Sequence, residues 1–388
     1  MKNEFPLSDR ASVHLDMIRG LSALAVMVGH VRGLFFVNFS ESHSKSILLK
    51  AIYTLTGLGH EAVMVFFVLS GFFIASSVFR SFEAGRWSWR MYLINRLTRL
   101  QLVLLPALLF GVLWDQVGMR LPQAASLYYG SIPYIHTESV ASRATLPIFL
   151  GNLFFLQSLF SPSFGSNNPL WSLSYEFWYY MLFPVLLFVV SSRLGLQRRL
   201  LYAVVGLALF GLIGPTVGFY FLIWLAGAAV GLGPRSTHLR FPRTALLWSA
   251  LSALLFVLAL AFSRARLVKP EMLVDFVVAA GFTLWLYVLV HLPEGRLSRV
   301  YSKVARSLAG FSYTLYLTHF PLVLLLRGWL NGETWWQPGA RHLLYGLLLS
   351  TVVAAYAYLV ARLTEANTDA IRRRISLFFS PRQREVAA

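Results

Sequence analysis

Arg19 and His30 are the strongest candidates among the four ionisable residues of the apolar run of residues 15–37, which also holds Asp16 and Arg32. An arginine at the centre of a membrane helix costs about 2.5 to 3.5 kcal/mol on insertion scales, so such residues indicate function. They are eleven residues apart, close to three helical turns, so both side chains leave one face roughly 16 Å apart. His30 suits a general base, because imidazole accepts a proton near neutral pH; a histidine satisfied by a neighbouring helix is the alternative. Arg19 has two equally good explanations: it binds an anion, or its side chain reaches the nearby membrane surface.

A basic segment precedes the apolar run of residues 97–118. Arg96 and Arg99 are three residues apart and therefore share a helix face. Guanidinium groups bind phosphate through two parallel hydrogen bonds, so this pair, with Arg90 before it, suits a phosphate clamp. An interfacial belt explains the segment equally well, because it also holds Arg80, Arg86, Trp87, Trp89 and Tyr92.

A carboxylate, Glu176, follows Pro169 and Trp171 at the start of the run of residues 170–191. Proline is favourable at a helix start, so we expect Glu176 about two turns below the membrane surface. A carboxylate at that depth needs a cation, a histidine or a substrate hydroxyl as its partner. We therefore predict that Glu176 belongs to a site.

Two further runs hold weaker candidates. Ser70 precedes a glycine in the run of residues 57–79, a pattern more typical of close helix packing than of chemistry. In the run of residues 308–328, Tyr316 and His319 share one face and Tyr313 lies one turn earlier. Packing between helices explains these three side chains as well as a site does.

The run of residues 273–292 carries an ionisable residue near each end, Asp275 and His291. Contact with lipid headgroups or water is sufficient to explain both. We assign neither to a site.

The composition indicates which elements must position these groups. Hydrophobic residues make up 57% of the 388 residues and charged residues 13%, against about 25% charged in soluble domains. We therefore predict an all-α polytopic membrane protein. The net charge of +18 is distributed over helix ends, which favours membrane lipids over nucleic acid as partner. The chain has no cysteine and no metal-ligand spacing, so we expect no metal.

We expect ten spans, because runs of about 17 to 25 apolar residues suit a membrane crossing. The positive-inside rule then places both termini in the cytoplasm, with 23 of the 34 lysines and arginines on that side and 10 outside. Segments five and six are separated only by Gly214 and Pro215, and joining them would give nine spans. The predicted spans are residues 15–37, 57–79, 97–118, 170–191, 199–213, 217–233, 244–263, 273–292, 308–328 and 342–364.

Three regions follow from this topology. Residues 1–14 form a cytoplasmic segment before a retained first span, and residues 15–364 form one membrane domain. Residues 119–169 are its long outer loop, a candidate cover for a site. Residues 365–388 form a cytoplasmic tail whose basic and apolar stretch 371–379 predicts a helix on the membrane surface.

Five segments occur in a specific order along the chain: Leu-Asp-x-Ile-Arg-Gly-Leu at 15–21 with His30 eleven residues after Arg19, Phe-Phe-x-Leu-Ser-Gly-Phe at 66–72, Arg96-x-x-Arg99, Leu-Trp-Ser-Leu-Ser-x-Glu at 170–176, and Ser-Tyr-x-Leu-Tyr-Leu-x-His-Phe at 312–320. Together they resemble the membrane O-acyltransferases of acyltransferase family three, over about residues 13–362. The resemblance implies transfer of an acyl group, most often acetyl from acetyl-coenzyme A (acetyl-CoA), to a hydroxyl of a carbohydrate or glycan acceptor. It also implies an integral protein of a bacterial inner membrane.

On this reading, Arg96 and Arg99, helped by Arg90 and Arg19, hold the phosphates of acetyl-CoA. His30 is the general base, and Glu176 orients His30 or the acceptor hydroxyl. Direct transfer and a relay through acyl-His30 both stay open, as do the acceptor's identity and the oligomeric state. A transporter or flippase is the rival function. The supporting or substrate-contacting candidates are Asp16, Ser70, Trp171, Tyr313, Tyr316 and His319.

Overall fold

The computed structural model describes residues 7–130, 139–233, 242–265 and 268–379, and this part of the chain is helical with no β-strand. The all-α prediction is confirmed. The α-helices are α1 (Asp9–Phe35), α2 (Ile47–Leu55), α3 (Gly59–Glu83), α4 (Trp89–Met119), α5 (Ala125–Tyr129), α6 (Val140–Arg143), α7 (Leu146–Leu153), α8 (Trp171–Val190), α9 (Leu196–Leu232), α10 (Pro242–Ala265), α11 (Glu271–Val290), α12 (Arg299–Ala309), α13 (Ser312–Leu330), α14 (Ala340–Leu363) and α15 (Thr368–Phe379). Four 3₁₀ turns join them: η1 (Phe39–Glu41), η2 (Pro122–Ala124), η3 (Asn168–Leu170) and η4 (Glu365–Asn367).

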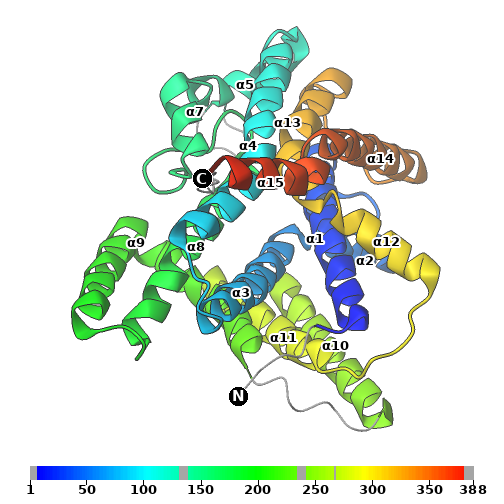
Figure 1. Cartoon of the computed structure of the whole chain (residues 1–388). Helices are drawn as coiled ribbons and strands as arrows, with labels where there is room; N and C mark the ends of the chain where they lie inside the picture. Colours follow the sequence, from blue (N-terminus) through cyan, green and yellow to red (C-terminus); the bar gives the residue numbers. More distant parts are fainter. Residues whose placement is uncertain (1–6, 131–138, 234–241, 266–267, 380–388) are drawn as a thin grey trace.

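Four helices, α1, α3, α4 and α13, surround the centre of the bundle, and α15 crosses one of its faces (Figure 1). Helix α1 packs against α3, α12 and α13. Eight helices are long and apolar enough to cross a membrane within the described residues, and the pair α12–α13, bent by 54°, makes up to nine. This count is one below the predicted ten because the predicted spans 199–213 and 217–233 lie in one broken helix, α9, which is counted once.

Helix α9 is broken at Gly214, whose φ of 71° and ψ of 174° lie outside the helical range. The side chain of Trp89, at the start of α4, donates a hydrogen bond to Tyr202 in the first half of α9 (3.0 Å). The hydroxyl of Ser76, near the end of α3, donates a hydrogen bond to the carbonyl of Gly231 in the second half of α9 (3.1 Å). Only a short segment joins α3 to α4, so both ends of α9 lie at the same end of the bundle. The two halves therefore run in opposite directions, as the separate spans were expected to do.

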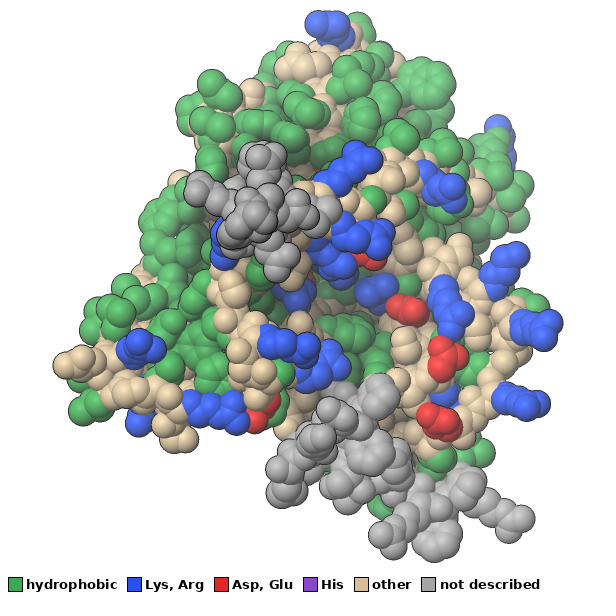
Figure 2. Space-filling model, in the orientation of Figure 1, with side chains coloured by type: hydrophobic (Ala, Val, Ile, Leu, Met, Phe, Trp, Pro, Cys, Tyr) green, Lys and Arg blue, Asp and Glu red, His purple; other side chains and the backbone are tan. Residues whose placement is uncertain are grey.

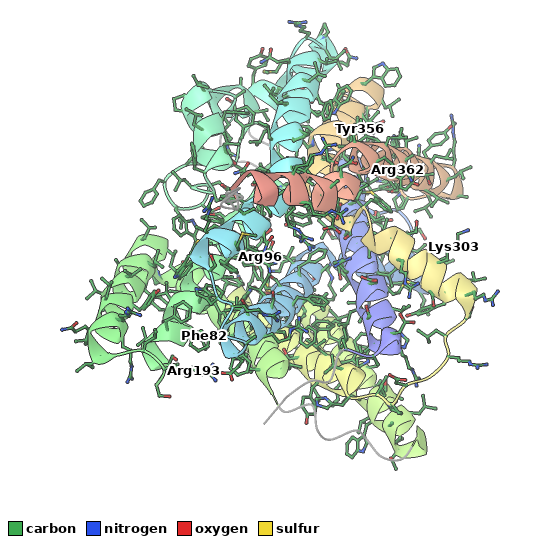
Figure 3. The ribbon with its side chains drawn as sticks, viewed as in Figure 1. Phe82, Arg96, Arg193, Lys303, Tyr356 and Arg362 are labelled. Atoms are coloured by element: carbon green, nitrogen blue, oxygen red, sulfur yellow. The ribbon has the colours of Figure 1, made fainter. Side chains whose placement is uncertain are left out.

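The same end of the bundle is held by contacts between helix ends. Arg193, after α8, forms a 2.6 Å ion pair with Glu83 at the end of α3, and its guanidinium lies 5.5 Å from the centre of the Phe82 ring (Figure 3). Arg19 of α1 lies toward this end, whereas His30 lies toward the opposite one. We call these two ends of the bundle the Arg19 end and the His30 end.

Helices α3 and α9 approach closely because of glycines. A Cβ atom on Gly71 would lie 1.9 Å from the carbonyl oxygen of Trp224, and one on Gly227 would lie 1.9 Å from that of Val68. No side chain fits at such distances, so the packing predicted for the Ser70–Gly71 pair is confirmed.

The predicted long loop carries η2, α5, α6 and α7 and returns to the bundle at Ser166. The carboxylate of Asp115, near the end of α4, is 1% exposed and accepts hydrogen bonds from the backbone N–H of Ser166 (2.8 Å) and from its hydroxyl (2.6 Å). Gly165 has a φ of 56°, and a Cβ there would lie 2.3 Å from Asp115 Oδ2. This anchor fixes the entry of η3 and α8 into the bundle.

The helix predicted for residues 371–379 of the tail lies within α15, and its position on a membrane surface stays a prediction; residues 380–388 lie outside the described part. Glu365, just before α15, accepts hydrogen bonds from the backbone N–H (3.0 Å) and hydroxyl (2.9 Å) of Thr314 in α13. This contact ties the tail to the Arg19 end. Figure 2 shows lysine and arginine side chains gathered on the face that α15 crosses.

Candidate active site

Two cavities meet inside the bundle, one toward each end. The arginine cavity, of about 240 Å³, takes its polar lining from Arg19, Ser70, Arg96, Arg99, Ser172, Glu176, Tyr180, Ser312, Tyr313 and Tyr316. The histidine cavity, of about 200 Å³, is lined by Val26, Gly29, His30, Arg32, Thr56, Gly57, Gly59, His60, Val63, Asn168, Pro169, Trp171 and Tyr316. Val63 and Tyr316 line both cavities, so these two side chains form the wall between them.

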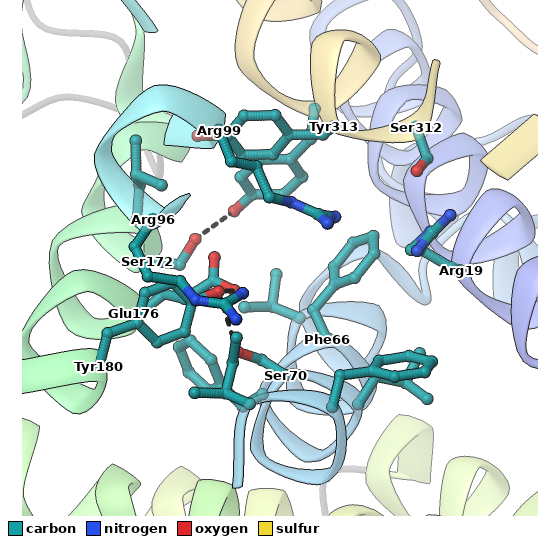
Figure 4. Close-up of a pocket in the computed structure, with 17 residues that line it drawn as sticks. Arg19, Phe66, Ser70, Arg96, Arg99, Ser172, Glu176, Tyr180, Ser312 and Tyr313 are labelled. Atoms are coloured by element: carbon teal, nitrogen blue, oxygen red, sulfur yellow. Dashed lines mark hydrogen bonds between the residues drawn. The ribbon is translucent and has the colours of Figure 1, made fainter. Parts of the chain in front are cut away.

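Three guanidinium groups line the arginine cavity. Arg19 donates hydrogen bonds to Asp16 (3.1 Å) and to the carbonyl of Ala309 (3.4 Å), and Arg96 donates to the hydroxyl of Ser77 (3.3 Å). Arg99 forms no hydrogen bond or ion pair with the described residues and extends across the cavity toward Arg19 (Figure 4). Three cations facing one confined space attract a polyanion.

The carboxylate of Glu176 lies in this same cavity and accepts a hydrogen bond from the Tyr180 hydroxyl, one turn along α8. The chain of hydrogen bonds continues, since Ser70 donates to the Tyr180 hydroxyl (3.3 Å) and the indole of Trp224 donates to Ser70 (3.1 Å). These contacts join α8, α3 and α9. They fix Glu176 toward the cavity rather than toward lipid.

His30 is held by a second histidine. Nδ1 of His30 lies 2.8 Å from Nε2 of His319, and Nδ1 of His319 lies 2.9 Å from the carbonyl oxygen of Leu315. A carbonyl only accepts, so Nδ1 of His319 carries a proton. His319 is fully buried, and burying an unpaired charge is costly, so its ring is neutral and its Nε2 accepts.

This assigns the tautomer of His30. Its Nδ1–H donates to His319, which leaves Nε2 with a lone pair and with no hydrogen-bond partner among the described residues. His30 lines the histidine cavity, and the ring of Phe320 packs edge-on against it at 4.9 Å. His30 is therefore placed as a general base would be, and His319 is placed as the residue that orients it.

Tyr316 completes the wall between the two cavities. Its hydroxyl lies 2.7 Å from the Ser172 hydroxyl and 3.1 Å from the carbonyl oxygen of Pro169. Its ring packs edge-on against Phe66 at 5.7 Å. Tyr316 precedes His319 by one turn of α13, so the wall and the partner of His30 come from one helix.

Comparison with known proteins decides the family. Residues 13–360 match the sequence model of the acyltransferase family-three domain. This chain belongs to acyltransferase family three. The acyltransferase is similar to Acyltransferase MdmB of Streptomyces mycarofaciens, with 26% identity over 373 residues that cover 88% of this chain and 87% of that protein. No solved structure matches the chain significantly.

The fold of this acyltransferase places most of the predicted site residues in or next to the two cavities. The arginine cavity contains Arg19, Ser70, Arg96, Arg99, Glu176, Tyr313 and Tyr316, and the histidine cavity contains His30, Trp171 and again Tyr316. His319 supports His30 from behind the cavity, and Asp16 pairs with Arg19. Arg90 lies elsewhere, in a hollow that it lines with Ile375 of α15.

Glu176 was expected to orient His30 or the acceptor hydroxyl. Within the described part of the chain it forms no hydrogen bond with His30, and its role toward the acceptor hydroxyl stays a prediction. The two side chains lie on opposite sides of the Tyr316 wall, and His319 holds His30 instead.

Sequence reasoning also misjudged two residues near the ends of a predicted span. Asp275 was explained by exposure at a span end, which is wrong: it is 2% exposed and accepts a hydrogen bond from His60. His291 is likewise buried, at 4% exposure, and its ring contacts the carbonyl of Tyr287. No spacing in the sequence linked His60 to Asp275, which lie 215 residues apart.

Proposed function

We propose that this membrane acyltransferase transfers acetyl from acetyl-CoA to a hydroxyl of a carbohydrate or glycan acceptor, with His30 as the general base. One observation carries the proposal: a cavity walled by three arginines ends at Tyr316, and the oriented base lies beyond the same wall. Family membership favours this enzyme over the transporter or flippase considered from the sequence.

The arginine cavity suits the donor. Coenzyme A carries several phosphates, and Arg19, Arg96 and Arg99 would bind them with charge-assisted hydrogen bonds. Arg90 lines a different hollow of α4, next to α15, so it is not part of this proposed donor site. The carboxylate of Glu176 would accept a hydrogen bond from an amide N–H of the pantetheine arm. The thioester would then lie beside Tyr316, where the two cavities adjoin, so that an acceptor hydroxyl at His30 would reach its carbonyl carbon.

In the transfer step, Nε2 of His30 takes the proton of the acceptor hydroxyl as its oxygen bonds to the thioester carbonyl carbon. The carbon–sulfur bond then breaks, and the leaving thiolate takes the proton from His30. Overall, the acetyl group moves from the sulfur of coenzyme A to the acceptor oxygen, the proton moves from that oxygen to the sulfur, and His30 returns to its starting state. His319 acts through His30 and is a positioning residue.

An acyl-His30 relay is the competing mechanism. In it, Nε2 attacks the thioester and passes the acetyl group on to the acceptor. Incubation with radiolabelled acetyl-CoA without acceptor, followed by rapid quenching, separates the two. Label retained on the wild-type protein but not on His30→Ala supports the relay, and label-free protein supports direct transfer.

The proposal includes an orientation in a bacterial inner membrane, with both termini and the Arg19 end in the cytoplasm. The distribution of cations along the sequence and the basic face crossed by α15 support it. Cytoplasmic acetyl-CoA then enters from the side where it is made, and the histidine cavity faces the other side.

The test measures transfer of radiolabelled acetyl from acetyl-CoA by purified protein in lipid nanodiscs, with glycosides as acceptors. We expect His30→Ala to lower kcat by about 10² to 10⁴, the usual contribution of a positioned base. His43→Ala, which removes an exposed histidine on the segment after α1, is the matched control and should retain full activity. A His30→Ala protein as active as the control overturns the role of His30.

A further inference from the structure

His60, in the first turn of α3, lines the histidine cavity and plays no part in the transfer step described above. Its Nε2 lies 2.9 Å from Oδ1 of Asp275 on α11, and since a carboxylate oxygen only accepts, Nε2 carries a proton. Nδ1 has no hydrogen-bond partner among the described residues, and 51% of the side chain is exposed. His60 thus has a ring nitrogen available to a molecule in the cavity.

Asp275 holds the orientation of that ring. Its second oxygen accepts a hydrogen bond from the Tyr220 hydroxyl of α9 (2.6 Å), so both carboxylate oxygens are used. Burial of a carboxylate is tolerated when it is hydrogen-bonded in this way. Three helices, α3, α9 and α11, therefore cooperate to fix one imidazole at the edge of the cavity.

Trp171 provides a flat apolar surface next to His60. The two rings are nearly parallel, with centres 6.4 Å apart and planes 23° apart, and both line the cavity. The polar side chains of Arg32, Thr56 and Asn168 line it as well. A sugar ring matches such a surface, because its C–H face is apolar and its hydroxyl groups project from the edge.

We propose that the histidine cavity is the acceptor site, that one sugar ring of the acceptor occupies it, and that His60 binds a second hydroxyl of that ring while the reacting hydroxyl meets His30. Asp275 and Tyr220 are positioning residues that act through His60. This proposal rests on the proposed function and adds to it the residues that recognise the acceptor.

The test compares sugar acceptors with a simple alcohol. Purified protein in nanodiscs receives radiolabelled acetyl-CoA and, below their micelle concentrations, the octyl glycosides of glucose, galactose, mannose and N-acetylglucosamine, with 1-octanol as the ring-free acceptor. We expect the wild type to prefer at least one glycoside over 1-octanol. His60→Ala should raise the KM for that glycoside about fivefold to tenfold, the usual effect of one hydrogen bond, and leave the KM for acetyl-CoA and for 1-octanol unchanged.

A second variant checks the positioning role. Asp275→Asn should raise the glycoside KM in the same direction by a smaller factor, with no further effect in the His60→Ala background, whereas a merely structural role would lower kcat with every acceptor. His43→Ala is the control, with wild-type constants expected. An unchanged glycoside KM in His60→Ala overturns the proposal, as does a wild type that turns over acetyl-CoA but acetylates none of the glycosides. A wild type with no acetyl-CoA turnover at all counts against the proposed function instead.

Discussion

The side chain of His30 donates from Nδ1 to Nε2 of His319 over 2.8 Å, across a separation of 289 residues in the sequence. The planes of the two rings are nearly parallel, with an angle of 18° between them. Because His319 is anchored in turn to the carbonyl of Leu315, the direction of the free nitrogen of His30 is set by α13 rather than by its own helix.

His319→Ala should therefore lower kcat about 10- to 100-fold, the usual effect of removing a partner that orients a reactive side chain, with little change in either KM. His319→Gln should recover most of kcat, because its amide oxygen can accept the same hydrogen bond from His30. Steady-state kinetics of both variants in nanodiscs checks this. Equal losses in the two variants would show that a hydrogen-bond acceptor at this position does not restore kcat, and would contradict the positioning role of His319.

Arg99 is the arginine of the cavity that has no hydrogen bond or ion pair with the described residues. We expect Arg99→Ala to raise the KM for acetyl-CoA about 10- to 100-fold with kcat nearly unchanged, because a charge-assisted hydrogen bond contributes roughly 1.5 to 3 kcal/mol. Arg99→Lys should lie between, since it retains the charge but not the fork.

Arg120→Ala is the matched control for that series. It removes an exposed arginine after the opposite end of the same helix, and its KM for acetyl-CoA should equal the wild-type value. A similar KM in Arg99→Ala and Arg120→Ala would remove Arg99 from the donor site.

Most of the fold could be predicted because apolar runs of spanning length are unmistakable in a sequence. The ambiguity fell on Gly214–Pro215, where the reversal of α9 depends on one residue with positive φ. A local pattern of this kind does not reveal whether two helical stretches continue or fold back. Contacts with α3 and α4, far away in the chain, decide it.

The site was predictable to the extent that each of its residues is costly inside a membrane. Arg19, His30 and Glu176 each appear within an apolar run, and all three line the two cavities. Which of them touch could not be predicted, because helix neighbours are chosen by packing. Asp275 shows the limit of sequence reasoning. It lies near the end of a predicted span, yet its side chain is buried against α3 and α9.

The close approach of α3 and α9 gives a stability prediction. Gly71→Ala places a Cβ at 1.9 Å from the Trp224 carbonyl and should destabilise the protein by about 1 to 3 kcal/mol or more, as overpacking does. Gly211→Ala, in the first half of α9, meets no atom within 4 Å and should be neutral or slightly stabilising. Thermal unfolding in detergent compares the two. A Gly71→Ala protein as stable as Gly211→Ala would contradict the packing of α3 on α9.

Tyr316 gives the last prediction, because its ring separates the two cavities and its hydroxyl only anchors it to Ser172 and Pro169. Tyr316→Ala should open the wall, admit water to the thioester and raise the ratio of acetyl-CoA hydrolysis to acetyl transfer by about fivefold or more, since water exclusion is what protects a reactive group in a closed site. Tyr316→Phe retains the ring and should keep the ratio near the wild-type value, with a modest loss of kcat. The measurement is coenzyme A released per acetyl group transferred. An unchanged ratio in Tyr316→Ala would mean that Val63 and the surrounding helices, not Tyr316, keep the cavities apart.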